Sequence, residues 1–217
     1  MFLQSSANRL YFASRLTIAI AGFCCSAPAI AGDSPPTQVD ASIVEHYVTE
    51  MWSGADVAWR QRLKQDQTQA LCSQFRNDPP HDVADSIRGR EAATISYPTD
   101  GALLGNWREG EKIAQNGRGG QFSDAPDTVR GGNCYACHQM AKTEVSHGTL
   151  GPSLSEYGKI RSFSADAAKD AYAKIYNSQA SFACSTMPRF GAHNFLSVQQ
   201  IKDLVAYLFD PESPVNK

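Results

Sequence analysis

One run of five residues, Cys134-Tyr135-Ala136-Cys137-His138, constrains this chain more than any other part of its 217 residues. It has the spacing C-x-x-C-H, in which two thiols lie on one helical turn and a histidine follows directly. That spacing matches the two vinyl groups on one edge of a haem, so both thiols can form thioether bonds. The histidine then lies under the iron as the proximal ligand. The run therefore predicts one covalently attached haem c, bonded to Cys134 and Cys137, with His138 on the iron.

Two other kinds of site share the C-x-x-C spacing. A thioredoxin-type redox pair is expected after a buried strand, whereas here the residues Gly131-Gly132-Asn133 come first. A zinc site needs a second C-x-x-C or a close pair of histidines, and the sequence contains neither. Covalent haem is therefore the interpretation that the spacing favours.

The first 31 residues have the three parts of a secretory signal peptide. Arg9 and Arg15 supply the positive flank, residues 16–23 form the apolar segment, and residues 29–31 form a small-x-small cleavage site. Haem attachment to C-x-x-C-H in bacteria takes place outside the cytoplasm, so export fits the haem motif. We therefore expect a periplasmic protein that is cleaved after Ala31.

The sequence does not favour a membrane span or a nucleic-acid partner. The apolar run of residues 16–23 is too short to cross a bilayer, and no later run is long enough. Lipid attachment at Cys24 is disfavoured, because the bulky Phe23 precedes it where a small residue is expected. The formal net charge is -2, and loss of the two leader arginines would make it -4. Such a charge has no basic footprint for nucleic acid.

Export also affects how the remaining cysteines are interpreted. Cleavage after Ala31 would leave four cysteines, of which haem would take two. Disulfides persist in the oxidising compartment outside the cytoplasm. We therefore predict that Cys72 and Cys184 form a disulfide that closes a long loop. The alternative is two free thiols.

Hydrophobic periodicity predicts an all-α protein with two parts after the signal peptide. Residues 32–103 are an N-terminal extension, with two helices between residues 40 and 75, a break at residues 77–81, and a connector over residues 85–101. Residues 104–217 are the haem domain. Its predicted helices begin at caps formed by Asn106, Ser164 and Ser197.

The iron needs a second axial ligand from the other side of the haem. Met140 is too close to His138 to cross the ring, and Met51 lies in the extension. Met187 lies in a loop, residues 186–191, whose proline and glycine would turn the thioether inward. Ligation by methionine and histidine raises the haem potential and suits electron transfer.

Alternative candidates for this position remain. Met187 could be an ordinary core methionine. His147 and His193 are possible imidazole donors, and Cys184 is a possible thiolate donor unless it is bonded to Cys72. If both axial positions are filled by the protein, the iron has no open site, which argues against oxygen activation and peroxidase chemistry.

Three segments of the haem domain together resemble SoxX, the monohaem c-type cytochrome subunit of the SoxAX complex of bacterial sulfur oxidation. They are Gly-Asn-Cys-Tyr-Ala-Cys-His-Gln at residues 132–139, Gly-Pro-Ser-Leu at residues 151–154, and Met-Pro-Arg-Phe-Gly at residues 187–191. The first two are shared with many class I cytochromes c. The third, together with the Gly-Asn-Cys sequence, is more specific.

The resemblance implies a class I cytochrome c-like fold, haem c on Cys134 and Cys137, and axial ligation by His138 and Met187. It also implies a heterodimer with a SoxA-like cytochrome subunit. That complex is similar to an L-cysteine S-thiosulfotransferase, which joins thiosulfate to a cysteine of the SoxYZ carrier protein and passes two electrons to a small cytochrome c. In the family the chemistry takes place at the partner's haem, so this chain would carry no catalytic residue and would relay electrons.

Two other functions are compatible with the haem motif. One is a stand-alone periplasmic electron-transfer cytochrome c. The other is a ligand sensor, in which Met187 would leave the iron to open a binding position. The N-terminal extension is longer than that of the shortest SoxX proteins, and it would either add partner surface or clamp the haem domain.

Overall fold

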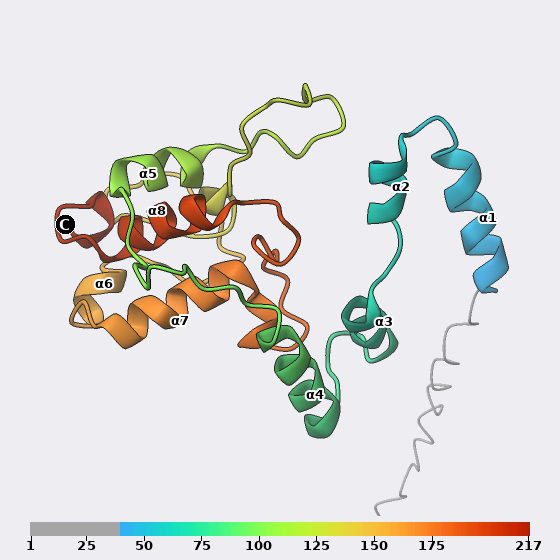
Figure 1. Ribbon diagram of the computed structural model, residues 1–217, viewed down its shortest axis with the longest axis horizontal. Helices are drawn as coiled ribbons and strands as arrows, with labels where there is room; N and C mark the ends of the chain where they lie inside the picture. The colour runs from blue at the N-terminus through green and yellow to red at the C-terminus, as the bar shows by residue number, and fades with distance from the viewer. Residues whose placement is uncertain (1–39) are drawn as a thin grey trace, which may run out of the picture. The chain divides into compact units, whose positions relative to one another are not determined.

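The structure is a computed structural model that describes residues 40–217, and Figure 1 shows its helices in chain order. The expected signal peptide, residues 1–31, lies outside the described residues. Contacts divide the chain into a unit that ends at Ala55 and a unit from Asp56 to Lys217. Residues 40–217 contain no strand, and the predicted all-α class is confirmed for them. No helix in this part of the chain has the length and apolar character to cross a membrane.

The described part of the first unit contains the helix α1 (Ala41–Met51). Asp40 begins it by accepting a hydrogen bond from the Ser42 amide at 2.8 Å. Its apolar side chains recur at helical spacing, as predicted, but none of its residues is buried.

Two more aspartates begin the helices α2 (Val57–Arg62) and α3 (Gln67–Gln74). Asp56 and Asp66 each accept a hydrogen bond from the amide three residues later, at 3.0 and 2.8 Å. The prediction of two helices between residues 40 and 75 was therefore wrong. Three are present because each of three aspartates satisfies free amide groups in a first turn.

The helix α4 (His81–Ala92) occupies part of the predicted connector, so that prediction was wrong for residues 85–92. This helix has no side-chain N-cap, and its buried residues are Ile87 and Glu91. Ile87 packs against the cysteines of a disulfide, and Glu91 pairs with Arg189. Contacts with distant residues therefore specify α4, and a periodic apolar face does not.

The helices α5 (Trp107–Gln115) and α8 (Val198–Phe209) pack closely against each other in the second unit (Figure 1). Gly110 makes this approach possible, because a Cβ atom there would lie 2.0 Å from the carbonyl oxygen of Asp203. Asp203 also accepts a hydrogen bond from the Asn106 amide at 2.8 Å. The start of α5 is thereby attached to the middle of α8.

The helices α7 (Ala165–Tyr176) and α6 (Tyr157–Ile160) also contact α8. The predicted caps Asn106, Ser164 and Ser197 are confirmed, and Ser197 forms a complete capping box with Gln200. Short 3₁₀ turns occur at η1 (Cys134–Ala136), η2 (Ser178–Ala180) and η3 (Pro214–Asn216).

The main core of the second unit lies between α5, α7 and α8. Its fully buried apolar side chains include Tyr172, Ile201, Val205 and Tyr207. The Tyr172 hydroxyl donates a hydrogen bond to the Ser96 carbonyl at 2.8 Å. Residues 56–103 thus belong to the same compact unit as the expected haem domain, and contacts do not divide the chain at the predicted boundary before residue 104.

Candidate functional site

The C-x-x-C-H run forms a tight turn that brings its side chains together. Asn133 takes a left-handed backbone conformation with φ of 47°, and the turn η1 follows. The amides of Cys137 and His138 both donate to the Cys134 carbonyl, at 3.0 and 2.8 Å. Both cysteines are free of disulfides. The two thiols and the imidazole therefore come from one compact piece of backbone.

Burial raises the pKa of the Cys134 thiol to about 12. Thiols that act in redox exchange usually have a lowered pKa, because the thiolate is the reactive form. This environment does not match a thioredoxin-type pair. In the described residues 40–217, moreover, no group of three or more His, Cys, Asp and Glu side chains could hold a metal ion by itself.

The imidazole of His138 is oriented by the segment that follows the motif. Its Nδ1 lies 2.7 Å from the carbonyl oxygen of Pro152, which can only accept, so Nδ1 donates. The lone pair of Nε2 is then available for a metal. Gly151 lies against the ring, because a Cβ atom at this position would lie 2.2 Å from the ring Cε1 of His138. The Gly-Pro pair is therefore part of the histidine's support.

The motif opens onto a cavity of about 620 Å³. That volume is within the range of roughly 300–1,000 Å³ found for small-molecule and cofactor sites. The side chains that line it are mainly apolar and come from the motif, the segment of residues 150–154, α7 and the loop around Met187. The cationic side chains of Arg161 and Lys174 also line it and would complement the two carboxylates of a haem. The residues present therefore fit this group.

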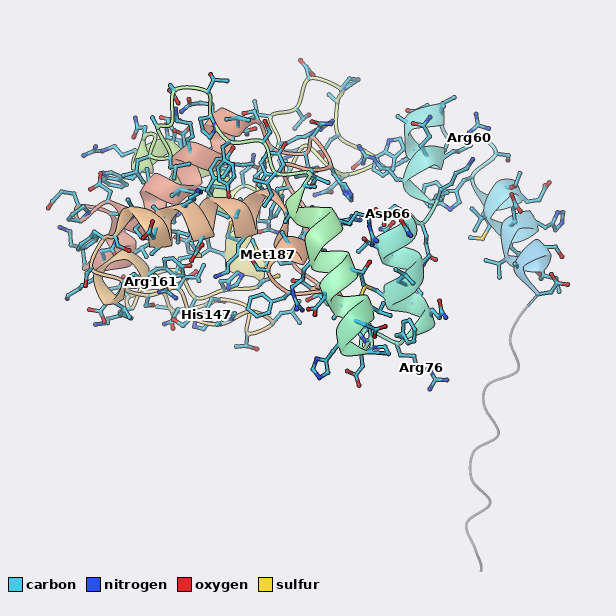
Figure 2. All side chains as sticks on the ribbon, turned by 60° about the horizontal axis from the view of Figure 1, so that its bottom comes forward. Arg60, Asp66, Arg76, His147, Arg161 and Met187 are labelled. Atoms are coloured by element: carbon cyan, nitrogen blue, oxygen red, sulfur yellow. A yellow bond between two sulfur atoms is a disulfide. The ribbon has the colours of Figure 1, made fainter. Side chains whose placement is uncertain are left out.

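Of the candidates for the second axial position in this unit, Met187 is the one that lines the cavity. Its carbonyl accepts a hydrogen bond from the Ser178 hydroxyl at 2.5 Å. Met140 is buried in the core and does not line the cavity. His147 does not line it either, and its Nδ1 lies 3.1 Å from the carbonyl oxygen of Gly148. Figure 2 labels Met187 and His147, together with Arg161 of the cavity.

The other two candidates are placed elsewhere. His193 lies 3.8 Å from Asp66 and lines a different cavity. Cys184 is bonded to Cys72 with a sulfur–sulfur distance of 2.10 Å, which is the predicted pairing. Cys184 therefore has no free thiolate that could bind the iron.

A buried polar cluster next to residues 185–188, which we call the methionine loop, was not predicted from the sequence. Arg189 pairs with Glu91 at 3.2 Å, and Asn177 donates to the same Glu91 carboxylate at 2.8 Å. Burial by itself raises the pKa of Glu91, but hydrogen bonds from Asn177, Thr68 and Arg189 outweigh it and lower the pKa below its usual range. Glu91 is therefore an ionised carboxylate inside the protein. No periodicity marks these residues, because they come from parts of the chain about 100 residues apart.

The family model of cytochrome c matches residues 108–210, which include the C-x-x-C-H motif, the cavity-lining helices and the methionine loop. This chain contains a cytochrome c domain. Its cofactor is accordingly covalently attached haem c. The match lies within the predicted haem domain and does not reach α2, α3 and α4.

A curated relative of this cytochrome is known from Aquifex aeolicus (strain VF5), where it is described as an uncharacterized lipoprotein. The two chains are 40% identical over 164 residues, which cover 70% of this chain and 73% of the relative. An alignment of that length extends beyond the 108–210 stretch, so the likeness includes part of the chain outside the family match.

Proposed function

We propose that this cytochrome c is an electron-transfer protein in which Cys134 and Cys137 hold haem c through thioethers and His138 and Met187 are the axial ligands. The observation that carries the proposal is that all four side chains line one apolar cavity. When bound, the haem iron supplies a one-electron couple. His138 offers Nε2, because Pro152 holds its other nitrogen. Met187 would offer a thioether from the loop of residues 186–191, and the mainly apolar lining would limit the access of water to the iron.

The more specific function that we propose is that of an electron-relay subunit in a SoxAX-like heterodimer. It is supported by the Met-Pro-Arg-Phe-Gly sequence that follows the haem motif. In this reaction, one sulfur–sulfur bond forms between thiosulfate and a carrier cysteine, the thiol loses its proton, and two electrons leave. The bond forms at the partner subunit, which makes the complex an L-cysteine S-thiosulfotransferase. This chain would pass the electrons singly to a small cytochrome c.

A native purification tests the heterodimer. The chain is expressed with a tag in its own host, and every co-purifying band is stained for haem. We expect a stoichiometric second c-type subunit, and we expect thiosulfate and a SoxYZ-like carrier together to reduce the haem. A monomer that exchanges electrons but does not respond to thiosulfate would instead establish the alternative, a stand-alone electron carrier.

We also propose that the protein acts in the periplasm after cleavage at Ala31. Cytochrome c domains are typically found outside the cytoplasm, and the leader of this chain has the parts of a signal peptide. The relative from Aquifex is described as a lipoprotein, so membrane attachment is the alternative to be tested. The intact mass of the mature protein separates the two. A chain that begins at Gly32 supports release, whereas a lipidated chain that retains Cys24 or Cys25 contradicts it.

A further inference from the structure

The methionine loop, residues 185–188, lies between two cavities. Its residues line the cavity of about 620 Å³ at the haem motif and also a second cavity of about 400 Å³. Polar residues around α3, among them Gln65, Gln69 and Asn77, line the second cavity. Side chains that fill a core resist movement, but a cavity does not. Few packed side chains therefore support the side of the loop that faces the second cavity. The contacts at the two ends of the loop hold it in place.

Arg189 holds the end of the loop after Met187. Its guanidinium donates to Asp66 at 2.5 Å and to Glu91 at 3.2 Å. The side chains of Arg189 and Glu91 are only 8% and 7% exposed. Asp66 is the N-cap of α3, and Glu91 lies in the last turn of α4. In Figure 2, Asp66 and Met187 lie on either side of α4.

Cys184 and Asn177 connect the chain before Met187 to the same two helices. Cys184 is bonded to Cys72 of α3. Asn177 is fully buried and donates to the Glu91 carboxylate at 2.8 Å. Thr68 of α3 donates to the other oxygen of that carboxylate. One carboxylate of α4 therefore meets the chain both before and after the methionine loop.

The haem domain supports the loop from inside through residues of η2. Ser178 donates to the Met187 carbonyl at 2.5 Å, and Gln179 donates to the Ser185 carbonyl at 3.0 Å. Asn177 begins this turn by accepting from the Gln179 amide at 3.1 Å. Because Glu91 holds Asn177, the inner support also depends on α4.

We propose that α3 and α4 form a clamp that positions Met187 as an axial ligand, with Glu91 and Arg189 as positioning residues. The proposal rests on the axial role of Met187 argued above. It gives a function to residues 66–92, which lie outside the stretch that matches the cytochrome c family. Loosening the clamp increases the fraction of molecules in which the thioether is away from the iron. An external ligand then binds more tightly in proportion to that fraction.

Imidazole binding to the oxidised holoprotein is the direct test. The variant Glu91→Gln/Arg189→Gln replaces both charged groups with neutral amides, so neither charge is left buried alone. We expect the affinity for imidazole to rise about tenfold. We also expect the near-infrared thioether–iron band to be lost on heating before the far-ultraviolet helix signal. A folded variant with wild-type imidazole affinity and coincident transitions would overturn the clamp.

Two comparisons make this test specific. Arg88→Gln changes an exposed arginine on α4 that pairs with Asp85, and it should leave imidazole affinity unchanged. Cys72→Ser/Cys184→Ser loosens the clamp at its other attachment and should raise imidazole affinity in the same direction. If the double glutamine variant does not fold, the cysteine variant decides the matter, and wild-type affinity there overturns the proposal.

The variant Met187→Ala separates this proposal from the function on which it rests. If this change leaves the near-infrared band intact, the axial assignment itself is wrong and the clamp proposal fails with it. If this change abolishes the band while the clamp variants keep wild-type imidazole affinity, the clamp proposal alone is wrong.

Discussion

Met187 and His138 are each held by a hydrogen bond to a backbone carbonyl, which is that of Pro152 for His138 and Met187's own carbonyl for Met187. The Pro152 carbonyl holds one ring nitrogen of His138, and the Ser178 hydroxyl holds the carbonyl of Met187. Neither support adds a charge to the cavity. Since the lining is mainly apolar, the two ligands would bind the iron in a medium that favours the less charged, reduced state.

Replacing Met187 by alanine tests the thioether ligand at the scale of one residue. The near-infrared band of the oxidised haem should disappear and the reduction potential should fall, because a sulfur donor that raises the potential is lost. Absorption spectroscopy and a redox titration measure both changes. Met140→Leu is the matched control: Met140 is buried away from the cavity, and a change of similar volume should leave the band in place. A band that survives Met187→Ala would contradict the assignment.

At the scale of elements, the contact between α5 and α8 shapes the haem domain. Gly110 lies where the backbones meet, and a Cβ atom there would overlap the Asp203 carbonyl. The opposite case is Gly89 of α4, where a Cβ atom would have nothing within 4 Å. Close packing therefore requires a glycine at position 110 but not at position 89.

Alanine at each of these glycines should change stability in opposite directions. Gly110→Ala should lower the free energy of unfolding by about 1–3 kcal/mol, the usual effect of overpacking. Gly89→Ala should raise it by roughly 0.5–1 kcal/mol, since alanine has the higher helix propensity and no neighbour is displaced. Urea unfolding of the haem-loaded protein measures both. A Gly110→Ala variant as stable as the wild type would show that the two helices can separate at no cost.

The attachment of α4 predicts a pH dependence. The pKa of Glu91 is lowered in the folded protein, so ionised Glu91 stabilises the fold above its ordinary pKa near 4.5. This contribution is lost as the pH falls through the lowered pKa. At pH 7, Glu91→Gln should reduce the free energy of unfolding by roughly 3 kcal/mol, the lower end for a broken buried pair, because Asp66 still faces Arg189.

The difference between wild type and Glu91→Gln should therefore shrink below about pH 4.5. Unfolding curves measured from pH 7 downward would show it. Asp85→Asn, on the exposed side of the same helix, should change stability by less than about 0.5 kcal/mol at pH 7. A Glu91→Gln effect that stays constant with pH would mean that the pKa of Glu91 is the same in the folded and unfolded protein, which would contradict the prediction.

At the scale of the whole molecule, the disulfide joins parts of the chain that are 112 residues apart. Cys72 and Cys184 form a small apolar cluster with Ile87, separate from the main core. This cluster and the polar cluster of Glu91 are the means by which α3 and α4 become part of the second unit. Residues 56–107, which precede the cytochrome c match, are therefore built into the same compact structure as the match itself.

Thiol titration of the denatured mature protein tests this connection. Before reduction no thiol should react, because haem takes Cys134 and Cys137 and the bridge takes the other pair. Two thiols should react after reduction. Cys72→Ser/Cys184→Ser should lower the free energy of unfolding by about 2–4 kcal/mol through the freed loop. Two reactive thiols before reduction would exclude the bridge.

The features that could be predicted from the sequence are those that local interactions encode. The C-x-x-C-H spacing places its three side chains on one turn, and a cap such as Ser197 with Gln200 acts within four residues. Such features are independent of the rest of the chain, and so is the helical periodicity that predicted the all-α class. The missed N-caps at Asp56 and Asp66 were equally local and could have been found in the same way.

The folded structure was needed to show which side chains meet over long distances. It placed Met187, alone among the candidate ligands of the second unit, on the lining of the cavity at the haem motif. It also formed a helix over residues 81–92, which local periodicity did not indicate. It also buried the pair of Glu91 and Arg189. Each outcome depends on closing a loop of many residues, and the entropic cost is repaid only when the whole unit packs. A local pattern carries no information about that balance.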